Sequence, residues 1–191
     1  MKEGYYHTSE SVKEYIELAK DVNGAEHIAE IQKYLAENSK LLELGTGPGT
    51  DFEILSKTYH VTGSDYSSEF IKHLENKYPK AKLLEVNAAQ IPSETIFDGI
   101  YSNKVLHHLS DNELESSVKT QHAALTENGL ICHTFWKGEG YEIFKGMYVN
   151  YHSKAEIKGL FQNHFEIIEL TEYAEFEEGD SIRLIARKKQ I

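Results

Sequence analysis

The sequence has few of the residues that secreted, membrane-spanning or linker-rich proteins need. Its 191 residues include one cysteine, Cys132, and three prolines. A single cysteine excludes a disulfide within the chain and favours a reducing compartment, so we expect a cytoplasmic location. No apolar run approaches the roughly 18 residues of a membrane span, and the N-terminus lacks a signal-peptide core. We therefore expect a soluble protein without a membrane partner.

Positive charge is scarce as well. The chain carries 31 acidic and 20 basic residues, a formal net charge of -11, and its basic residues are dispersed except for Arg187, Lys188 and Lys189. Such a surface repels a polyanion at long range, so no nucleic-acid partner is expected. The ten histidines show no zinc-ligand spacing, and no metal site is expected either. A small molecule remains as the expected partner.

The pattern along the chain indicates alternating strands and helices. No repeat or glycine/serine-rich linker interrupts it, and the length suits one domain. Helical periodicity is present over 9–21 and 25–38. Capping boxes formed by Ser110 with Glu113 and by Ser153 with Glu156 predict two further helix starts. We predict strands at 40–44, 60–65, 82–87, 97–102, 129–135, 165–173 and 181–188, and helices at 50–58, 67–78, 110–125 and from 153.

Strands that alternate with helices through short connections form a parallel sheet covered on both faces. The last two strands follow each other through an acidic turn, "EFEEGDS", which predicts an antiparallel pair. We expect an α/β fold of the Rossmann-like, doubly wound kind. Its mostly parallel seven-stranded sheet has an antiparallel edge strand and helices on both faces.

A glycine loop, "ELGTGPG" from Glu43 to Gly49, follows the first strand. A nucleoside-triphosphate loop would end in Gly-Lys-Ser/Thr, but the first lysine after this loop is Lys57. A dinucleotide fingerprint would have its third glycine at position 50, which is Thr50. Glu43 and Asp51 also put negative charge where a phosphate would lie. The loop therefore suits an adenosine ligand without phosphate and with a positive end, such as S-adenosylmethionine.

This loop closely resembles the first motif of class I S-adenosylmethionine-dependent methyltransferases, in particular small single-domain members of the type 11/25 kind. The resemblance continues in order through "VTGSDYSSEFI", "LLEVNAAQIP", "FDGIYSNKVLHHL" and "LTENGLICHTF". It implies S-adenosyl-L-methionine as cofactor and methyltransferase activity. The alternatives are a methyltransferase-like module that binds the cofactor without turnover and, less favoured by Thr50 and the acidic loop, an NAD-dependent oxidoreductase.

The resemblance also implies the residues of the cofactor site. Asp65 matches the acid that binds both ribose hydroxyls, although it could instead cap the helix that follows. Asn87 and Ala88 stand where the family commonly has Asp-Ala, so the contact to adenine has a changed geometry. The cofactor residues implied are Glu43, Gly45, Thr46, Gly47, Gly49, Asp65, Tyr66, Asn87, Ala88, Ser102 and Asn103.

The acceptor end is less defined. His107 and His108 are adjacent, so at most one faces the pocket; we favour His108, and either is a candidate general base. Aromatic residues can pack in the core or contact an acceptor, and for the second role we name Tyr6, Trp136, Tyr141 and Tyr148. The fourth strand ends "SNKV" without the Asn/Asp-Pro-Pro-aromatic motif of nucleic-acid amino methylation. Cys132 lacks the Pro-Cys context of a pyrimidine nucleophile, so a small-molecule acceptor is expected.

We expect residues 1–191 to form one methyltransferase domain, either as a monomer or as a homodimer. In this division 1–38 is a helical cap or lid, 39–136 the cofactor-binding core, 137–152 a substrate-side insertion, and 153–191 a final helix and strand pair. Methyl transfer from a sulfonium is an in-line displacement that needs alignment and exclusion of water more than covalent help. The absence of a recognisable catalytic triad is therefore no objection to the prediction.

Overall fold

The computed structural model of the chain describes residue 6 and the ranges 8–20 and 22–190. Its main sheet has seven strands in the order β3-β2-β1-β4-β5-β9-β8. The five parallel strands are β1 (Lys40–Leu44), β2 (His60–Asp65), β3 (Lys82–Glu85), β4 (Phe97–Ser102) and β5 (Leu125–Trp136). The other two are β8 (Phe165–Tyr173) and β9 (Ser181–Lys188).

The sheet confirms the predicted fold class and refines its edge. Strand β9 runs antiparallel to both β5 and β8, so the reversed strand lies one place in from the edge. The parallel strands end at one edge of the sheet, and the strand order changes direction between β1 and β4. In open α/β sheets, ligands bind beyond the carboxyl ends of the strands at this switch point.

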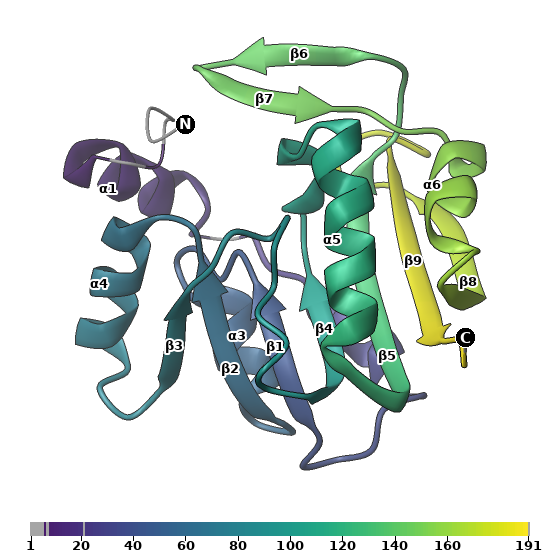
Figure 1. Ribbon diagram of the computed structural model, residues 1–191. Coiled ribbons are helices and arrows are strands. Elements are labelled where there is room, and N and C mark those ends of the chain that lie inside the picture. The colour runs from purple at the N-terminus through teal and green to yellow at the C-terminus, as the bar shows by residue number, and fades with distance from the viewer. Residues whose placement is uncertain (1–5, 7, 21, 191) are drawn as a thin grey trace.

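Helices cover both faces of the sheet (Figure 1). One face is covered by α2 (Ala25–Ile31), α3 (Thr50–Leu55) and α4 (Ser68–Lys77), and the other by α5 (Asp111–Ala123) and α6 (Lys154–Phe161). The N-terminal helix α1 (Ser9–Leu18) packs against α4. None of these helices, as far as the chain is described, is long and apolar enough to cross a membrane.

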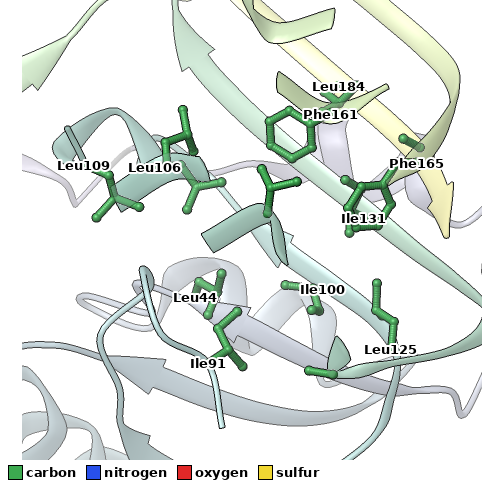
Figure 2. Close-up of a cluster of buried hydrophobic side chains, with 14 of the residues drawn as sticks. Leu44, Ile91, Ile100, Leu106, Leu109, Leu125, Ile131, Phe161, Phe165 and Leu184 are labelled. Carbon is green, nitrogen blue, oxygen red and sulfur yellow. The ribbon is translucent and has the colours of Figure 1, made fainter. Parts of the chain in front are cut away.

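Two hydrophobic cores hold the layers together. Leu42 and Leu41 are adjacent in β1 and point to opposite faces, so each belongs to a different core. The larger core joins the sheet to α5 and α6 and includes Ile100, Ile131 and Phe161 (Figure 2). Burial on both faces explains why β1, β2 and β4 have runs of consecutive buried residues rather than alternating buried and exposed ones.

Some elements differ from the prediction. A separate hairpin of β6 (Tyr141–Phe144) and β7 (Met147–Asn150) was not predicted. Its turn residues Lys145 and Gly146 have φ angles of 50° and 80°, as in a type I′ turn, but Lys-Gly lacks the Asn-Gly signature of such turns. Helix α2 ends at Ile31, well before the predicted 38. Both predicted capping boxes are confirmed.

A chain of buried side-chain hydrogen bonds runs from β4 through β5 and α5 to the loop after β3. Ser102 Oγ lies 2.8 Å from His133 Nδ1, and His133 Nε2 lies 2.7 Å from Gln121 Oε1. Gln121 Nε2 donates to Ser117 Oγ at 3.0 Å, and Ser117 donates to the Ala88 carbonyl at 2.6 Å. Because the Gln121 oxygen only accepts, His133 carries its proton on Nε2 and accepts from Ser102. Each link therefore has one donor and one acceptor.

We expect the free energy of unfolding to fall as the pH drops below about 6.5, the ordinary pKa of histidine. Burial lowers the pKa of His133 to about 3. Between about pH 3 and pH 6.5, the imidazole of His133 therefore binds a proton in the unfolded protein but not in the folded one. At pH 5 this group alone should cost about 2 kcal/mol relative to pH 8. Urea unfolding at both pH values measures the difference.

His133→Gln is the matched variant for this measurement, because it keeps a polar side chain but has no imidazole to titrate. It should be less stable than the unmodified chain at pH 8 and should lose about 2 kcal/mol of the pH dependence. An unchanged pH dependence in this variant would contradict the assignment to His133.

Candidate active site

A cavity of about 1110 Å³ lies at the carboxyl ends of β1, β2 and β4. It brings most of the predicted cofactor and acceptor residues onto one lining. The predicted residues on this lining are Tyr6, Glu43, Gly45, Thr46, Gly47, Asp65, Tyr66, Asn87, Ala88, Asn103, His108, Tyr141 and Tyr148. Four predicted residues, Gly49, Ser102, His107 and Trp136, do not line it.

The glycine turn between β1 and α3 forms the floor of the cavity. Gly45 and Gly47 have φ angles of 65° and 50°, in the left-handed region that favours glycine. A Cβ on Gly45 would lie 2.4 Å from a Val105 methyl, whereas a Cβ on Gly47 would meet only the Gly45 carbonyl at 3.8 Å. Gly45 thus allows tight packing, and Gly47 leaves the backbone accessible from the cavity. Gly49 instead packs below the turn, where a Cβ would collide with Leu74.

Asp65 at the end of β2 holds this turn in place. Its Oδ2 accepts a hydrogen bond from Gly47 N at 2.9 Å, and its Oδ1 accepts one from Ser67 N at 2.8 Å. The N-cap of α4 is Ser67, whose side chain accepts from Phe70 N, so Asp65 is not the cap itself. Asp65 also lines the cavity, and an ionised carboxylate is a hydrogen-bond acceptor. The geometry is therefore compatible with contacts to ligand hydroxyls.

Glu43 at the end of β1 is buried without full hydrogen bonding. The residue is 3% exposed, and its Oε2 has no hydrogen-bond partner among the described residues. Burial, reinforced by the nearby carboxylates of Asp51 and Asp65, raises the pKa of Glu43 well above its usual range. A positively charged ligand group beside Oε2 would satisfy the oxygen and stabilise its anionic form.

Asp51 organises the same region, although the sequence did not suggest this role. Its carboxylate accepts hydrogen bonds from Gly24 N at 2.6 Å, Tyr101 Oη at 2.8 Å and Asn103 Nδ2 at 3.1 Å. It thereby ties the start of α2 to the end of β4. Asn103 also accepts from Thr134 Oγ1 at 2.6 Å, so both ends of its amide are engaged by the protein. Asn103 therefore lines the cavity with an amide whose nitrogen and oxygen each already have a hydrogen-bond partner in the protein.

The loop after β3, where a contact to adenine was expected, forms a turn with Asn in place of the family's usual Asp. Asn87 Oδ1 accepts a hydrogen bond from Ala89 N at 2.9 Å, and Ala88 is fixed through its carbonyl by Ser117. Thr46 has a similar supporting contact, since its Oγ1 accepts from Ser64 N at 2.9 Å. The prediction that Ser102 binds cofactor is corrected, because Ser102 is fully buried in the hydrogen-bonded chain described above.

The two adjacent histidines have different surroundings. His107 is 3% exposed, and burial holds its pKa well below the usual range. His108 is half-buried on the cavity lining, with Nδ1 2.8 Å from the Tyr148 carbonyl oxygen. Trp136 lies outside the cavity, where its ring is covered by the Lys104 ammonium at 3.4 Å. The structure therefore places His108, and neither His107 nor Trp136, where a ligand can reach.

Aromatic side chains form another part of the lining. The ring of Tyr6 lies 5.1 Å from that of Tyr15 and 6.0 Å from that of His108, in edge-to-face geometry. Across the cavity, the hairpin supplies Tyr141 and Tyr148, whose rings are 5.1 Å apart. Residues 1–5, 7 and 21 of the predicted N-terminal lid lie outside the described residues.

Within the described part of the chain, no group of three or more His, Cys, Asp or Glu side chains is placed to hold a metal ion. The arrangement offers instead a glycine turn, buried carboxylates and an aromatic wall around one cavity. It can hold a ligand that is positive at one end, and a second, partly apolar molecule beside it.

Sequence comparison matches residues 41–129 to the family model described as a methyltransferase domain. An uncharacterised methyltransferase of Oceanobacillus iheyensis is 31% identical over 110 residues. These residues are 56% of this chain and 52% of that relative, so the chain spans about half the length of the relative it matches.

Solved structures share the fold at low sequence identity. A 1,6-didemethyltoxoflavin N1-methyltransferase of Burkholderia thailandensis, with bound 1,6-didemethyltoxoflavin and S-adenosylhomocysteine, has a TM-score of 0.78 at 17% identity, covering 95% of this chain and 85% of that one. The N-methyltransferase NodS of Bradyrhizobium japonicum WM9, in complex with S-adenosylhomocysteine, has a TM-score of 0.70 at 15% identity, covering 89% and 90%. Residues 41–129 therefore match a methyltransferase domain, and the chain has the fold of solved N-methyltransferases that bind S-adenosylhomocysteine.

Proposed function

We propose that the chain transfers a methyl group from S-adenosylmethionine to a small-molecule acceptor. The observation that carries this proposal is one cavity whose lining combines buried carboxylates with tyrosine rings. Its volume of about 1110 Å³ is near the upper end of small-ligand pockets, with room for the cofactor and a compact second molecule. The two solved relatives, named as N-methyltransferases, were captured with S-adenosylhomocysteine, which supports the same ligand here.

Four residues of the lining fit the proposed cofactor: Glu43, Gly47, Asp65 and Asn87. S-adenosylmethionine supplies the methyl group on a sulfonium when bound. Glu43 offers to a positive group a buried oxygen that has no hydrogen-bond partner among the described residues, and the carboxylate of Asp65 on the lining suits ribose hydroxyls. Gly47 keeps the backbone open for close approach. Asn87 retains its Nδ2 as a donor for an adenine edge, because only its Oδ1 is used in the turn.

The hairpin and α1 are placed to hold the acceptor and to exclude water from it. On the hairpin, Tyr141 and Ile143 line the cavity yet are 67% and 62% exposed, so their apolar surface lies at its mouth. The hairpin turn reaches α1 through an ion pair between Lys145 and Glu14, 3.1 Å long. In Figure 1, α1 and the hairpin lie over the same end of the sheet. We infer that these two segments cover the acceptor during methyl transfer.

Calorimetric titration followed by a turnover assay tests the proposal. S-adenosylhomocysteine should bind with measurable heat, and NAD should not, because the carboxylates oppose a pyrophosphate. Release of S-adenosylhomocysteine from S-adenosylmethionine with an acceptor library then separates an enzyme from a module that only binds. Heat with NAD alone would overturn the proposal in favour of an oxidoreductase.

Several expectations remain predictions. These are the cytoplasmic location inferred from the single cysteine, the monomeric or homodimeric state, the absence of a nucleic-acid partner and the four-part division of 1–191. The charge of -11 continues to favour a small molecule over a polyanion as acceptor.

Gly47→Leu should abolish S-adenosylhomocysteine binding while the chain stays folded. The new side chain would project into the cavity, and its φ of 50° would cost about 1 to 2 kcal/mol in backbone strain. Gly179→Leu is the matched control, since Gly179 has a φ of 72° and does not line the cavity. Isothermal titration and thermal unfolding of both variants measure the two effects. Binding by Gly47→Leu at the unmodified affinity would contradict the placement of the cofactor over the turn.

Asp65→Ala should weaken S-adenosylhomocysteine binding by about tenfold to a hundredfold. The substitution removes hydrogen bonds to two ligand hydroxyls, worth about 1.5 to 3 kcal/mol for a charged acceptor. It also removes the bonds to Gly47 N and Ser67 N, so some loss of stability accompanies it. Titration with 2′,3′-dideoxyadenosine and adenosine separates the causes, because only adenosine should lose affinity in the variant. A variant within twofold of the unmodified affinity would remove Asp65 from the site.

Hydrogen exchange should show protection of both covering segments when S-adenosylhomocysteine is bound. We expect slower exchange in α1 and in residues 141–150, beyond the protection of the glycine turn itself, because closure orders the backbone. Mass spectrometry with and without ligand measures this. Protection confined to 43–50, 65–67 and 87–89 would leave the covering role unsupported and favour an open site for a larger partner.

A further inference from the structure

We propose that His108 is the base that accepts a proton from the methyl acceptor. The acceptor is a ring-bearing molecule whose nucleophilic nitrogen or oxygen carries a proton, and which has no carboxylate or phosphate. This inference rests on the proposed methyltransferase function and deepens it.

The hydrogen bond to the hairpin fixes the tautomer of His108. Its Nδ1 lies 2.8 Å from the Tyr148 carbonyl oxygen, and a carbonyl can only accept, so Nδ1 carries the proton. Burial lowers the pKa of His108, which keeps the ring neutral near pH 7. Nε2 is then the nitrogen with the unshared pair, and it has no hydrogen-bond partner among the described residues. The ring thus presents a proton-accepting atom on the cavity lining.

His107 lacks these properties. It is 3% exposed, does not line the cavity, and has a buried Nδ1 without a hydrogen-bond partner among the described residues. Its ring lies 4.1 Å from that of His108 and acts as packing behind it. Of the two histidines, only His108 can meet a ligand.

The charge of the lining determines which acceptors fit. Lys104 is the one Lys or Arg among the described lining residues. Its ammonium group is already in contact with other groups of the protein. The Nζ atom donates to Ser181 Oγ at 2.6 Å and to the Phe135 carbonyl at 3.2 Å, and it lies 3.4 Å from the centre of the Trp136 ring. Its three N–H directions are therefore taken. Among the described lining residues, no Lys or Arg is therefore left to pair with an acidic acceptor.

The remaining groups favour a neutral or cationic ring. Glu113 and Glu175 add negative charge to the lining, and Glu175 lies 3.9 Å from Lys104. The tyrosine rings, from Tyr6 on one side and Tyr141 and Tyr148 on the other, provide surfaces that pack against an apolar ring or an ammonium group. A carboxylate or phosphate here would lose its hydration without gaining a partner.

The proposed step balances in electrons and protons. The nucleophilic atom of the acceptor uses its own electron pair to bond the methyl carbon, and the pair of the broken carbon–sulfur bond stays on sulfur. The proton released from the acceptor passes to His108 Nε2, which gives an imidazolium that returns it to solvent after the product leaves. No oxidant or further reactant is needed.

Other titratable groups surround His108. His107 lies on the same turn, Tyr6 comes from the N-terminal segment and Tyr148 from β7. Lys104 and Glu113 share the cavity lining with it. Any pH effect has to be separated from these groups by a variant of His108 itself.

The first test reads the tautomer of His108 by nitrogen-15 NMR of histidine-labelled protein loaded with S-adenosylhomocysteine, at about pH 7.5. We expect a protonated Nδ1 and an unprotonated Nε2. His108→Asn assigns the signals, and its amide nitrogen can still donate to the Tyr148 carbonyl in place of Nδ1. His108→Gln is the matched variant that loses this bond. A protonated Nε2 in the unmodified protein would overturn the role as base.

The second test compares two probes of one shape and opposite charge, tyramine and 3-(4-hydroxyphenyl)propionate, titrated into the same loaded protein. Tyramine should bind at least about tenfold more tightly and should shift the His108 Nε2 signal. Equal binding, preference for the carboxylate, or binding of neither probe would overturn the proposed acceptor class. The loading step separates the two proposals: failure to bind S-adenosylhomocysteine contradicts the methyltransferase function, whereas loading followed by either adverse result contradicts only this inference.

Discussion

Buried carboxylates at the carboxyl edge of the sheet are the constraint on which the rest of the site depends. Glu43, Asp51 and Asp65 lie within one short region, and each is at most 9% exposed. Carboxylates removed from water need donors or positive charge, since burial strongly disfavours the anion. Asp51 and Asp65 obtain donors from the backbone and from side chains, but Glu43 Oε2 has none among the described residues.

This constraint explains several local features together. The glycine turn has to bend so that Gly47 N reaches Asp65, and the start of α2 is held because Gly24 N donates to Asp51. A Cβ on Gly24 would lie 2.1 Å from the Tyr101 hydroxyl, so the close approach also requires glycine. The protein thus supplies donors to both oxygens of Asp51 and of Asp65, whereas Glu43 Oε2 has no donor among the described residues.

A second polar system supports the site from the opposite face of the sheet. The chain from Ser102 through His133 and Gln121 to Ser117 ends on the Ala88 carbonyl, which is part of the cavity-lining loop after β3. It carries no charge, because burial keeps His133 neutral, and all its donors and acceptors are matched. The loop is therefore positioned by a neutral network, while charge is concentrated at the ligand end.

The sequence was sufficient to predict the sheet and the tight glycine turn after its first strand. These features depend on residues that are close together in the chain. The alternation of strands with helices and the glycine turn between acidic residues can therefore be predicted from local sequence patterns. Side-chain contacts between residues far apart in the sequence could not be predicted in this way. Ser102 meets His133, which is 31 residues away, and Asp51 meets Gly24 across 27 residues. Such pairings arise only when the sheet assembles.

The residues expected near the acceptor show the same limit of prediction from local sequence. The hairpin has no usual turn signature, so the position of Tyr148, and with it the tautomer of His108, could not be inferred from the chain. Trp136 was expected to contact the acceptor, because nothing in the sequence showed that Lys104, across a strand pair, would cover its ring. The tyrosines and phenylalanine that do line the cavity come from three separate segments: the N-terminal segment with α1, the start of α4, and the hairpin.

Proton release during ligand binding tests the central claim most directly. Because burial raises the pKa of Glu43, a positive ligand group beside Oε2 should lower that pKa and expel a proton. Calorimetric titration of S-adenosylmethionine, in buffers of different ionisation enthalpy between about pH 5 and pH 8, measures the number of protons released. The account predicts release in the unmodified chain and its loss in Glu43→Gln. Binding without proton release at any pH in this range, or equal release by Glu43→Gln, would contradict it.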